Sequence, residues 1–289
     1  MAAIDSSADE RREPQVSCGR LLNYERFPSR FVAPRAIRVW TPEGYSEDKR
    51  YDVLYMHDGQ MLFDSEFSWN GQEWGVDETL GDLIGSGKVR PCIVVGIDNV
   101  PGLRIGEYCP DDISLFLGRR DRIFREYEPM GNAYLRFIVE ELKPFIDRNF
   151  STYTDREHTW IMGSSCGGLI SSYALCKYPD VFNGAACLST HCTMADPATN
   201  RRRPRFQRAY RKYLETHLPE ADSRFLYMDC GTETLDASYV EAQDELNRAI
   251  EELGWTSERF MHRLYEGHSH CEDDWRARLA VPLCFLLGM

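Results

Sequence analysis

Long apolar runs are missing from this sequence. Its 289 residues contain no stretch of about 18 uncharged apolar residues, so we expect no membrane-spanning helix and no membrane contact. The first residues, MAAIDSSADERREPQV, are polar and charged where a secretion signal needs an apolar segment. We therefore expect residues 1–17 to be a disordered leader and residues 18–289 to form one domain of a cytoplasmic protein.

Basic charge and paired cysteines are also scarce. The chain has 34 Lys and Arg against 46 Asp and Glu, a formal net charge of -12, which argues against nucleic acid as a partner. Its 10 cysteines form no C-x-x-C pair and several lie within apolar runs, so we expect reduced, mostly buried thiols. We find no internal repeat and no low-complexity tract. The 43% of hydrophobic residues is enough for a large core.

Short apolar runs alternate with segments of helical spacing along the chain. The first two predicted strands are expected to pair antiparallel, and Pro144 is expected to kink its helix or end it early. The alternation predicts one α/β domain with a mostly parallel central sheet and helices on both faces. Strands are predicted at 36–41, 51–56, 92–97, 160–162, 185–188, 225–230 and 259–265, helices at 77–84, 132–146, 169–175, 205–218, 239–253 and 273–287, and long loops at 98–131 and 189–204.

One junction between a strand and a helix has the pattern of a catalytic turn. The apolar run at 160–162 stops at GSSCGG, and a helical pattern follows at once. This is the setting that G-x-S-x-G requires to be a nucleophile elbow, with Ser165 at its centre. Glycines at 163 and 167 allow helix and strand to pack closely beneath the serine. The alternative is a Gly/Ser turn with no chemical role.

A serine hydroxyl becomes a nucleophile only with a base and an orienting acid, which follow it in the order Ser, Asp or Glu, His. Glu233 and Asp236 lie directly after one predicted strand, and His268 and His270 directly after the next. The acids are equally suited to capping the following helix. The two histidines and Cys271 resemble part of a metal site, yet no further ligands occur at matching spacing. We expect a triad and no metal.

Several longer runs, taken in order, resemble the Putative esterase family of α/β-hydrolases, which includes enterochelin esterase-like, feruloyl esterase-like and esterase D-like enzymes. The resemblance spans about residues 35–287 and implies the α/β-hydrolase fold. The runs are YDVLYMHDGQMLFD (51–64), WNGQEWGVDETL (69–80), VEELKPFID (139–147), IMGSSCGGLISSYALCKYPDVF (161–182), YMDCGTETLD (227–236) and EGHSHCEDDWRARL (266–279).

The resemblance implies a role for several residues. Ser165 matches the nucleophile of the family. His270 matches the base, because it keeps the H-x-E-x-x-W spacing with Glu272 and Trp275, whereas His268 does not. The family's reaction is hydrolysis of a carboxylic ester through an acyl-enzyme, which needs no cofactor.

The acid and the oxyanion donors follow from the same resemblance. Asp236 is preferred over Glu233 as the acid, because a short carboxylate beside an apolar anchor is held more rigidly. The assignment between these two acids stays open at this point. The backbone N–H of Cys166 is expected to be one oxyanion donor, and the N–H of Gln60 or Met61 the second.

The substrate is less well defined by the sequence. Trp69, Trp74, Glu107 and Tyr108 are expected to line the pocket of a small-molecule ester, of aryl, sugar-acyl or siderophore type, although buried core tryptophans are an equal alternative. An acyltransferase or peptidase with the same triad, or a binding module without catalysis, are the rival functions. The oligomeric state is left open.

Overall fold

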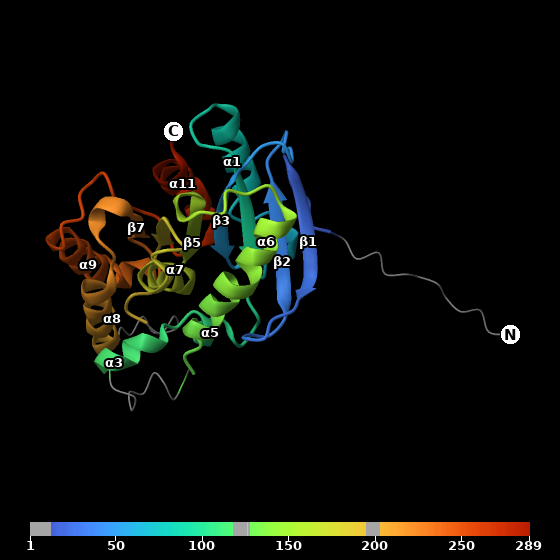
Figure 1. Cartoon of the computed structure of the whole chain (residues 1–289). Helices are drawn as coiled ribbons and strands as arrows, with labels where there is room; N and C mark the ends of the chain where they lie inside the picture. The colour runs from blue at the N-terminus through green and yellow to red at the C-terminus, as the bar shows by residue number, and fades with distance from the viewer. Residues whose placement is uncertain (1–12, 118–125, 127, 195–202) are drawn as a thin grey trace.

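A single mixed sheet runs through this computed structural model, which describes residues 13–117, 126, 128–194 and 203–289. The sheet has 8 strands in the order β1-β2-β4-β3-β5-β6-β7-β8 (Figure 1). β3 to β8 are mutually parallel, while β1 and β2 are antiparallel to their neighbours. The strands are β1 (Arg20–Phe27), β2 (Arg35–Thr41), β3 (Asp52–His57), β4 (Cys92–Ile97), β5 (Thr159–Ser164), β6 (Gly184–Leu188), β7 (Phe225–Gly231) and β8 (Phe260–Tyr265).

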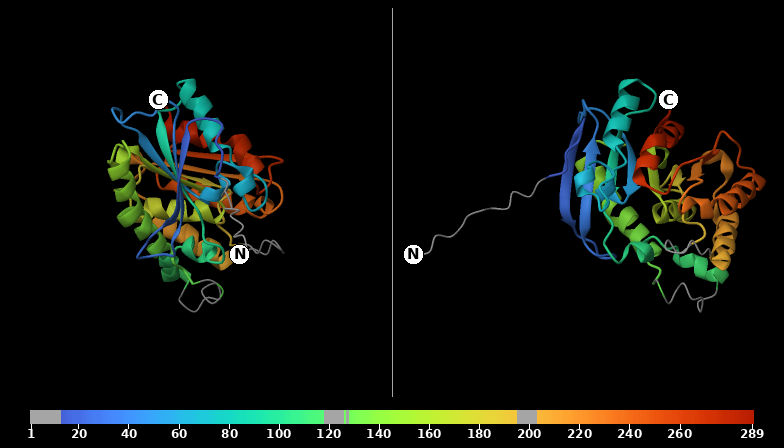
Figure 2. Two further views of the ribbon diagram at one scale, coloured as in Figure 1. Left: turned by 90° about the vertical axis from the view of Figure 1, so that its right-hand side faces the viewer. Right: turned by 180° about the vertical axis from the view of Figure 1, so that it is seen from behind.

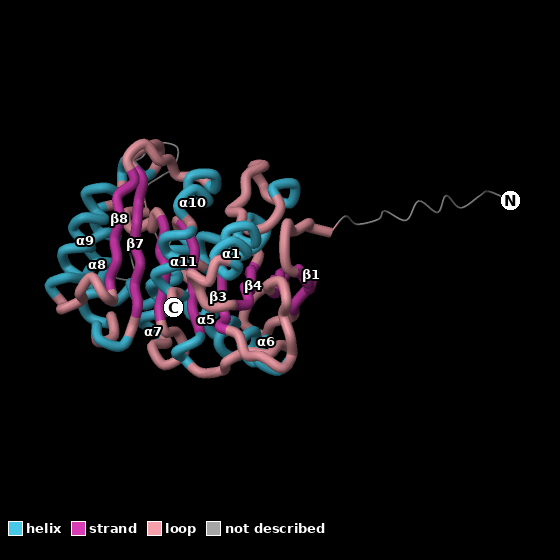
Figure 3. The backbone as a smooth tube through the Cα atoms, turned by 90° about the horizontal axis from the view of Figure 1, so that it is seen from above, coloured by secondary structure: helices cyan, strands magenta, loops and turns pink. Residues whose placement is uncertain are grey.

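Helices cover both faces of the sheet, as predicted. One face packs against α5 (Gly131–Arg136), α6 (Lys143–Asn149), α7 (Cys166–Lys177), α8 (Pro204–His217) and α9 (Val240–Glu252). The other packs against α1 (Val76–Gly85), α10 (Glu272–Arg278) and α11 (Ala280–Leu287), which lie near one another in Figure 3. Shorter helical segments are α2 (Arg104–Glu107), α3 (Ser114–Leu117), η1 (Gly59–Met61), η2 (Ser65–Phe67), η3 (Asp111–Ile113), η5 (Arg156–His158), η6 (Ala221–Ser223) and η7 (Asp236–Ser238).

The central strands are buried on both faces. In β3, Val53 and Tyr55 belong to one core cluster, while Leu54 and Met56 belong to the other. This follows from the two-residue repeat of a strand, which points successive side chains to opposite faces. Strands buried in this way read as continuous apolar runs, which is why β3, β4 and β5 were predictable from the sequence.

The N-terminal edge of the sheet differs from the prediction. β1 was not predicted, and β2 pairs with β1 and β4, so the expected pairing of the first two predicted strands is wrong. In the right-hand view of Figure 2, these blue N-terminal strands lie toward one side of the molecule and the orange elements toward the other, with the red C-terminal helix between them. The predicted leader lies outside the described residues up to residue 12, but Ser17 donates a hydrogen bond from its N–H to Asp77 at 2.6 Å. Ser17, a residue of the predicted leader, is therefore bonded to α1.

The helix that contains Pro144 continues past it. A π-helical segment, η4 (Phe137–Leu142), joins α5 to α6, and α6 extends to Asn149, so the predicted early end is wrong. The proline lacks an N–H and its ring crowds the preceding turn, which the wider π-helical turns accommodate.

All 10 cysteines are free, and most are buried, as expected from their apolar surroundings. Among the described residues, no helix has the length and apolar character to cross a membrane.

Candidate active site

The predicted triad residues all follow parallel strands at their carboxyl ends. Ser165 follows β5, Asp236 follows β7 and His270 follows β8. Because β5, β6, β7 and β8 run parallel, these ends meet at one edge of the sheet. This is where open α/β sheets bind their ligands.

The elbow holds Ser165 in a strained conformation. Its φ is 57° and its ψ is -122°, a region that residues other than glycine rarely occupy. Its N–H donates to the carbonyl oxygen of Leu188 at 2.9 Å, and its own carbonyl accepts from the N–H of His191 at 3.0 Å. A Cβ on Gly163 would lie 2.9 Å from the carbonyl carbon of Gly167. The glycines therefore permit close packing, while the serine itself carries the unusual backbone angles.

Asp236 and His270 form a hydrogen-bonded pair. The Nδ1 atom of His270 lies 2.6 Å from Oδ1 of Asp236, whose side chain has no exposed surface. The other oxygen, Oδ2, accepts from the N–H of Gly231 at 2.7 Å. Burial alone would raise the pKa of Asp236, but the hydrogen bonds and the charge of its partners outweigh burial and lower the pKa. An ionised Asp236 holds the proton of His270 on Nδ1, which leaves Nε2 as the basic atom.

The competing residues in the two loops lie elsewhere. Glu233 is exposed to solvent, and Nδ1 of His268 lies 3.5 Å from Oδ1 of Asp274. Thr234 accepts a hydrogen bond at Oγ1 from the N–H of His270, at 2.8 Å. The loops after β7 and β8 are thus bonded to each other, and Asp236 is the carboxylate they bring to His270.

His191 and Tyr239 link the elbow to His270. The sequence did not single out either residue for this role. Nδ1 of His191 is hydrogen-bonded to the Tyr239 hydroxyl, and the Tyr239 ring lies 5.6 Å from the ring of His270, edge to face. Burial lowers the pKa of His191 to about 3, so its imidazole is neutral at neutral pH. His191 was visible in the sequence only as a neighbour of Cys192, which gave no indication of this contact.

A buried hydroxyl behind Asp236 supports the acid. The Oγ of Ser189 donates to Oδ2 of Asp236 at 2.5 Å. The same Oγ accepts from Nε1 of Trp275 at 2.9 Å and from Nη2 of Arg278 at 2.8 Å. Arg278 is also paired with Asp229 at 3.0 Å, and its Nη2 lies 3.9 Å from Asp236. The hydrogen bond from Ser189 and the buried positive charge of Arg278 both favour the ionised form of Asp236.

The H-x-E-x-x-W motif gains a structural explanation from these contacts. Trp275 lies 5.0 Å from the His270 ring, edge to face, and Glu272 accepts from the side-chain amide of Asn70 at 2.7 Å. Trp275 therefore links His270 to Ser189, which supports the acid, and Glu272 links the same loop to the segment that follows β3.

The predicted oxyanion donors differ in their availability. Cys166 begins α7, and the first N–H groups of a helix have no partner within the helix. The N–H of Met61 donates to the carbonyl oxygen of Asp58 at 2.8 Å, so of the two predicted second donors Gln60 is the better candidate.

The residues predicted to bind substrate are mostly buried. Trp69 is 56% exposed, and its ring lies 5.9 Å from the guanidinium carbon of Arg104. Trp74 is 3% exposed and packs against Trp275 in the core, the alternative that the sequence left open. Glu107 and Tyr108 have no exposed surface.

Glu107 and Tyr108 have structural partners. Glu107 pairs with Arg35 at 2.6 Å, and the Tyr108 hydroxyl lies 3.3 Å from Oδ1 of Asp58. Burial therefore argues against direct substrate contact by these two residues, and Trp69 is the predicted pocket residue that a ligand can reach.

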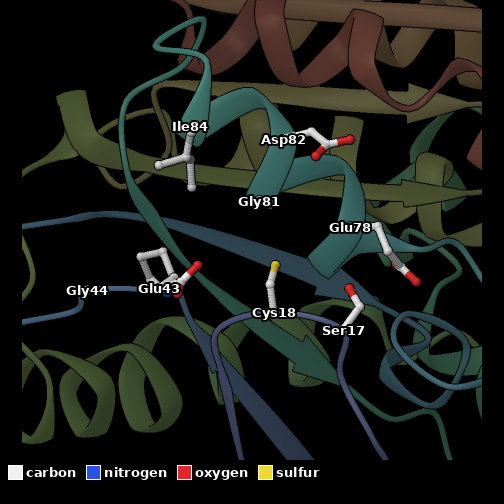
Figure 4. A pocket seen from close by; sticks show the side chains of 10 residues that line it. Ser17, Cys18, Glu43, Gly44, Glu78, Gly81, Asp82 and Ile84 are labelled. Carbon is white, nitrogen blue, oxygen red and sulfur yellow. The ribbon is translucent and has the colours of Figure 1, made fainter.

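One open pocket has no connection to these residues. It lies between the N-terminal segment, residues 42–44 and α1, as Figure 4 shows. Cys18, Glu43, Glu78 and Asp82 are among its lining residues. None of the predicted site residues lines it, so it carries no argument about catalysis.

Within the described part of the chain, no group of three or more His, Cys, Asp and Glu side chains is arranged to hold a metal ion.

Comparisons with known proteins identify relatives of this chain. The uncharacterized protein YbbA of Bacillus subtilis is 27% identical over 156 residues, which cover 54% of this chain and 56% of that protein. An endo-1,4-beta-xylanase/feruloyl esterase of Xylanibacter ruminicola is 24% identical over 250 residues, or 82% of this chain and 27% of that protein. The chain thus spans about half the length of the first relative and about a quarter of the second.

A solved structure with the same fold is a ferulic acid esterase, with a TM-score of 0.68 and 20% identity, covering 93% of this chain and 98% of that one. The likeness shows an α/β-hydrolase fold. The model of the family described as Putative esterase matches residues 29–286. The chain belongs to the Putative esterase family.

Proposed function

We propose that this protein is a serine esterase that hydrolyses a carboxylic ester through an acyl-enzyme, with Ser165 as nucleophile, His270 as base and Asp236 as acid. The observation that carries the proposal is the hydrogen-bonded pair of the buried Asp236 and His270, 2.6 Å apart, at the sheet edge that also carries the strained Ser165. Membership of the Putative esterase family supports the same reaction class.

The reaction has two steps. Nε2 of His270 takes the proton of the Ser165 hydroxyl as its oxygen attacks the ester carbonyl, and the proton then passes to the leaving alcohol. The N–H groups of Cys166 and Gln60 stabilise the oxyanion, and each such donor is typically worth about 10²-fold to 10³-fold in turnover. Water, activated by the same histidine, then releases the acid and restores the serine.

An aromatic acyl ester is the substrate we favour among aryl, sugar-acyl and siderophore-type esters. Trp69 is exposed and lies against Arg104, so it offers a flat apolar surface on which an aromatic ring can pack. The names of the feruloyl and ferulic acid esterases to which the chain is similar point to the same substrate class.

A panel of esters tests this function. Methyl hydroxycinnamates, acetylated sugars and a catechol-type siderophore ester should be compared by kcat/KM, with the first expected to be highest. Assays with sugar acceptors and with peptides separate an acyltransferase or a peptidase from an esterase. A folded protein that turns over no ester and whose Ser165 is not labelled by a fluorophosphonate would contradict the proposal and leave a binding module.

Replacing Asp236 with asparagine is expected to lower kcat by about 10³-fold to 10⁴-fold, because the amide cannot hold the histidine proton on Nδ1. Glu233→Gln is the matched control, since the same charge is removed from an exposed side chain in the same loop. It should change kcat less than about twofold, because an exposed substitution usually alters the free energy of unfolding by no more than about 0.5 kcal/mol and leaves the fold intact. An equal loss in both variants, measured with one ester, would count against Asp236 as the acid.

A further inference from the structure

The turn after β3, which carries the proposed Gln60 donor, has an unfavourable conformation at its first residue. Asp58 has φ 56° and ψ 50°, the left-handed region that favours glycine. Its carbonyl oxygen accepts from the N–H of Met61 at 2.8 Å, so the backbone of Asp58 sets the direction of the whole turn. A strained residue of this kind persists only where its surroundings hold it.

The side chain of Asp58 is held mainly by Arg104. Nε of Arg104 donates to Oδ1 at 2.8 Å and Nη2 donates to Oδ2 at 2.7 Å, a bidentate pair that fixes both position and orientation. The side-chain amide of Asn99 donates to Oδ1 at 2.6 Å. Only 8% of the Asp58 side chain and 22% of the Arg104 side chain are exposed, so water competes little for these bonds.

The carboxylate that Arg104 binds also lies beside the elbow, the other half of the proposed oxyanion site. A Cβ on Gly167, the residue after Cys166, would lie 3.6 Å from Oδ2 of Asp58, the oxygen that Nη2 of Arg104 binds. Its guanidinium carbon lies 5.2 Å from the ring centre of Tyr108 and 5.9 Å from that of Trp69. One side chain from the segment between β4 and α5 therefore binds the turn, whose carboxylate borders the elbow, and lies against the exposed tryptophan.

We propose that Arg104 is a positioning residue that holds the Asp58 turn against the elbow, so that the N–H groups of Gln60 and Cys166 converge on one oxyanion. The inference rests on the proposed function and adds a residue to it. Because the charge of Arg104 is matched by Asp58, its contribution is geometric rather than a free positive charge offered to the substrate. Donors that are fixed in advance stabilise the transition state without reorganisation.

The test compares Arg104→Gln and Arg104→Lys with Arg90→Gln as the matched control. Arg90 pairs with Asp52 at 3.1 Å at the opposite end of β3, so its loss removes a similar ion pair away from the site. Arg104→Gln should lower kcat by about 10-fold to 10²-fold, less than the loss of a whole donor, with KM changed less than about threefold. Arg104→Lys should recover part of the loss, because lysine keeps the charge without the bidentate fork. Arg90→Gln should leave kcat unchanged.

Inhibition separates positioning from substrate binding. A phenylboronic acid forms a tetrahedral adduct with a catalytic serine and needs the oxyanion donors, whereas benzoic acid is planar and does not. The inhibition constant of the boronic acid should rise in Arg104→Gln by about the factor by which kcat falls, and that of benzoic acid by less than about threefold.

Three outcomes would overturn the inference. A folded Arg104→Gln with kcat equal to that of Arg90→Gln removes the positioning role. An equal weakening of both inhibitors makes Arg104 a substrate-binding residue instead. Absence of ester turnover in the unmodified protein overturns the proposed function, and the role of Arg104 with it. If the unmodified protein is active, the first two outcomes overturn the role of Arg104 alone. Circular dichroism and the melting temperature of each variant show whether it is folded.

Discussion

Ser165→Ala is expected to lower ester turnover by about 10⁶-fold, to the level that oxyanion donors and binding alone provide. The reason is that Ser165 is the residue at the strained position between β5 and α7, where a side-chain oxygen meets the amino end of the helix. The measurement is kcat for one ester under saturating substrate, together with labelling of the intact protein by a fluorophosphonate. Labelling should be lost with activity.

The neighbouring serine provides the control for this prediction. Ser164 ends β5 within the sheet and is 5% exposed, so its side chain belongs to the core. Ser164→Ala should keep most of the activity and all of the labelling. Activity retained in Ser165→Ala, or lost equally in both variants, would disprove the assignment of the nucleophile.

His270→Ala is expected to cost about 10⁴-fold or more in kcat, because its loss leaves the serine without a base. The imidazole of His270 is held by Asp236 at 2.6 Å and packed against Trp275, so no other ring takes its place easily. Two buried imidazoles lie near the elbow, and each is bonded through Nδ1 to a tyrosine hydroxyl, His191 to Tyr239 and His57 to Tyr134. Steady-state kinetics on the purified variant measure the effect.

His268→Ala is the control for the base. His268 lies two positions earlier in the same loop and faces Asp274 rather than Asp236. We expect a loss of stability of about 1 kcal/mol or less, and a kcat within about threefold of the unmodified protein, because the fold and the pair of Asp236 and His270 stay in place. A larger loss in His268→Ala than in His270→Ala would reverse the assignment and with it the alignment of the H-x-E-x-x-W motif.

The central part of the fold was predictable from the sequence because it is apolar and regular. The central strands are short continuous apolar runs, and most of the helices between them repeat apolar residues every three or four positions. Both patterns are easy to recognise in a sequence. β1 was missed because its residues, RLLNYERF, mix charged and apolar side chains, and most are partly or fully exposed at the sheet edge. The position of β2 beside β4 depends on a crossover that periodicity does not encode.

The loops of the candidate site were predictable because polar residues interrupt apolar strands at fixed places. The residues that support the site were not. Arg278 lies in α10 among charged residues that suggest a solvated face, yet only 1% of its side chain is exposed. Ser189 and Arg104 lie in segments without clear periodicity, and their partners come from distant parts of the chain. Trp74 was predicted to line the pocket but is buried in the core, because the sequence alone does not distinguish a tryptophan in a pocket wall from one in the core.

The contact between Asn70 and Glu272 has a consequence for the speed of folding. These residues are 202 positions apart, and the ion pair of Glu73 with Arg276, at 2.7 Å, joins residues 203 apart. Closing loops of this length costs chain entropy before the contact stabilises anything, and chains rich in such contacts fold slowly. On dilution from denaturant, helical dichroism should therefore return well before hydrolytic activity, since the base and the turn after β3 become neighbours only when both ends of the chain have joined the sheet.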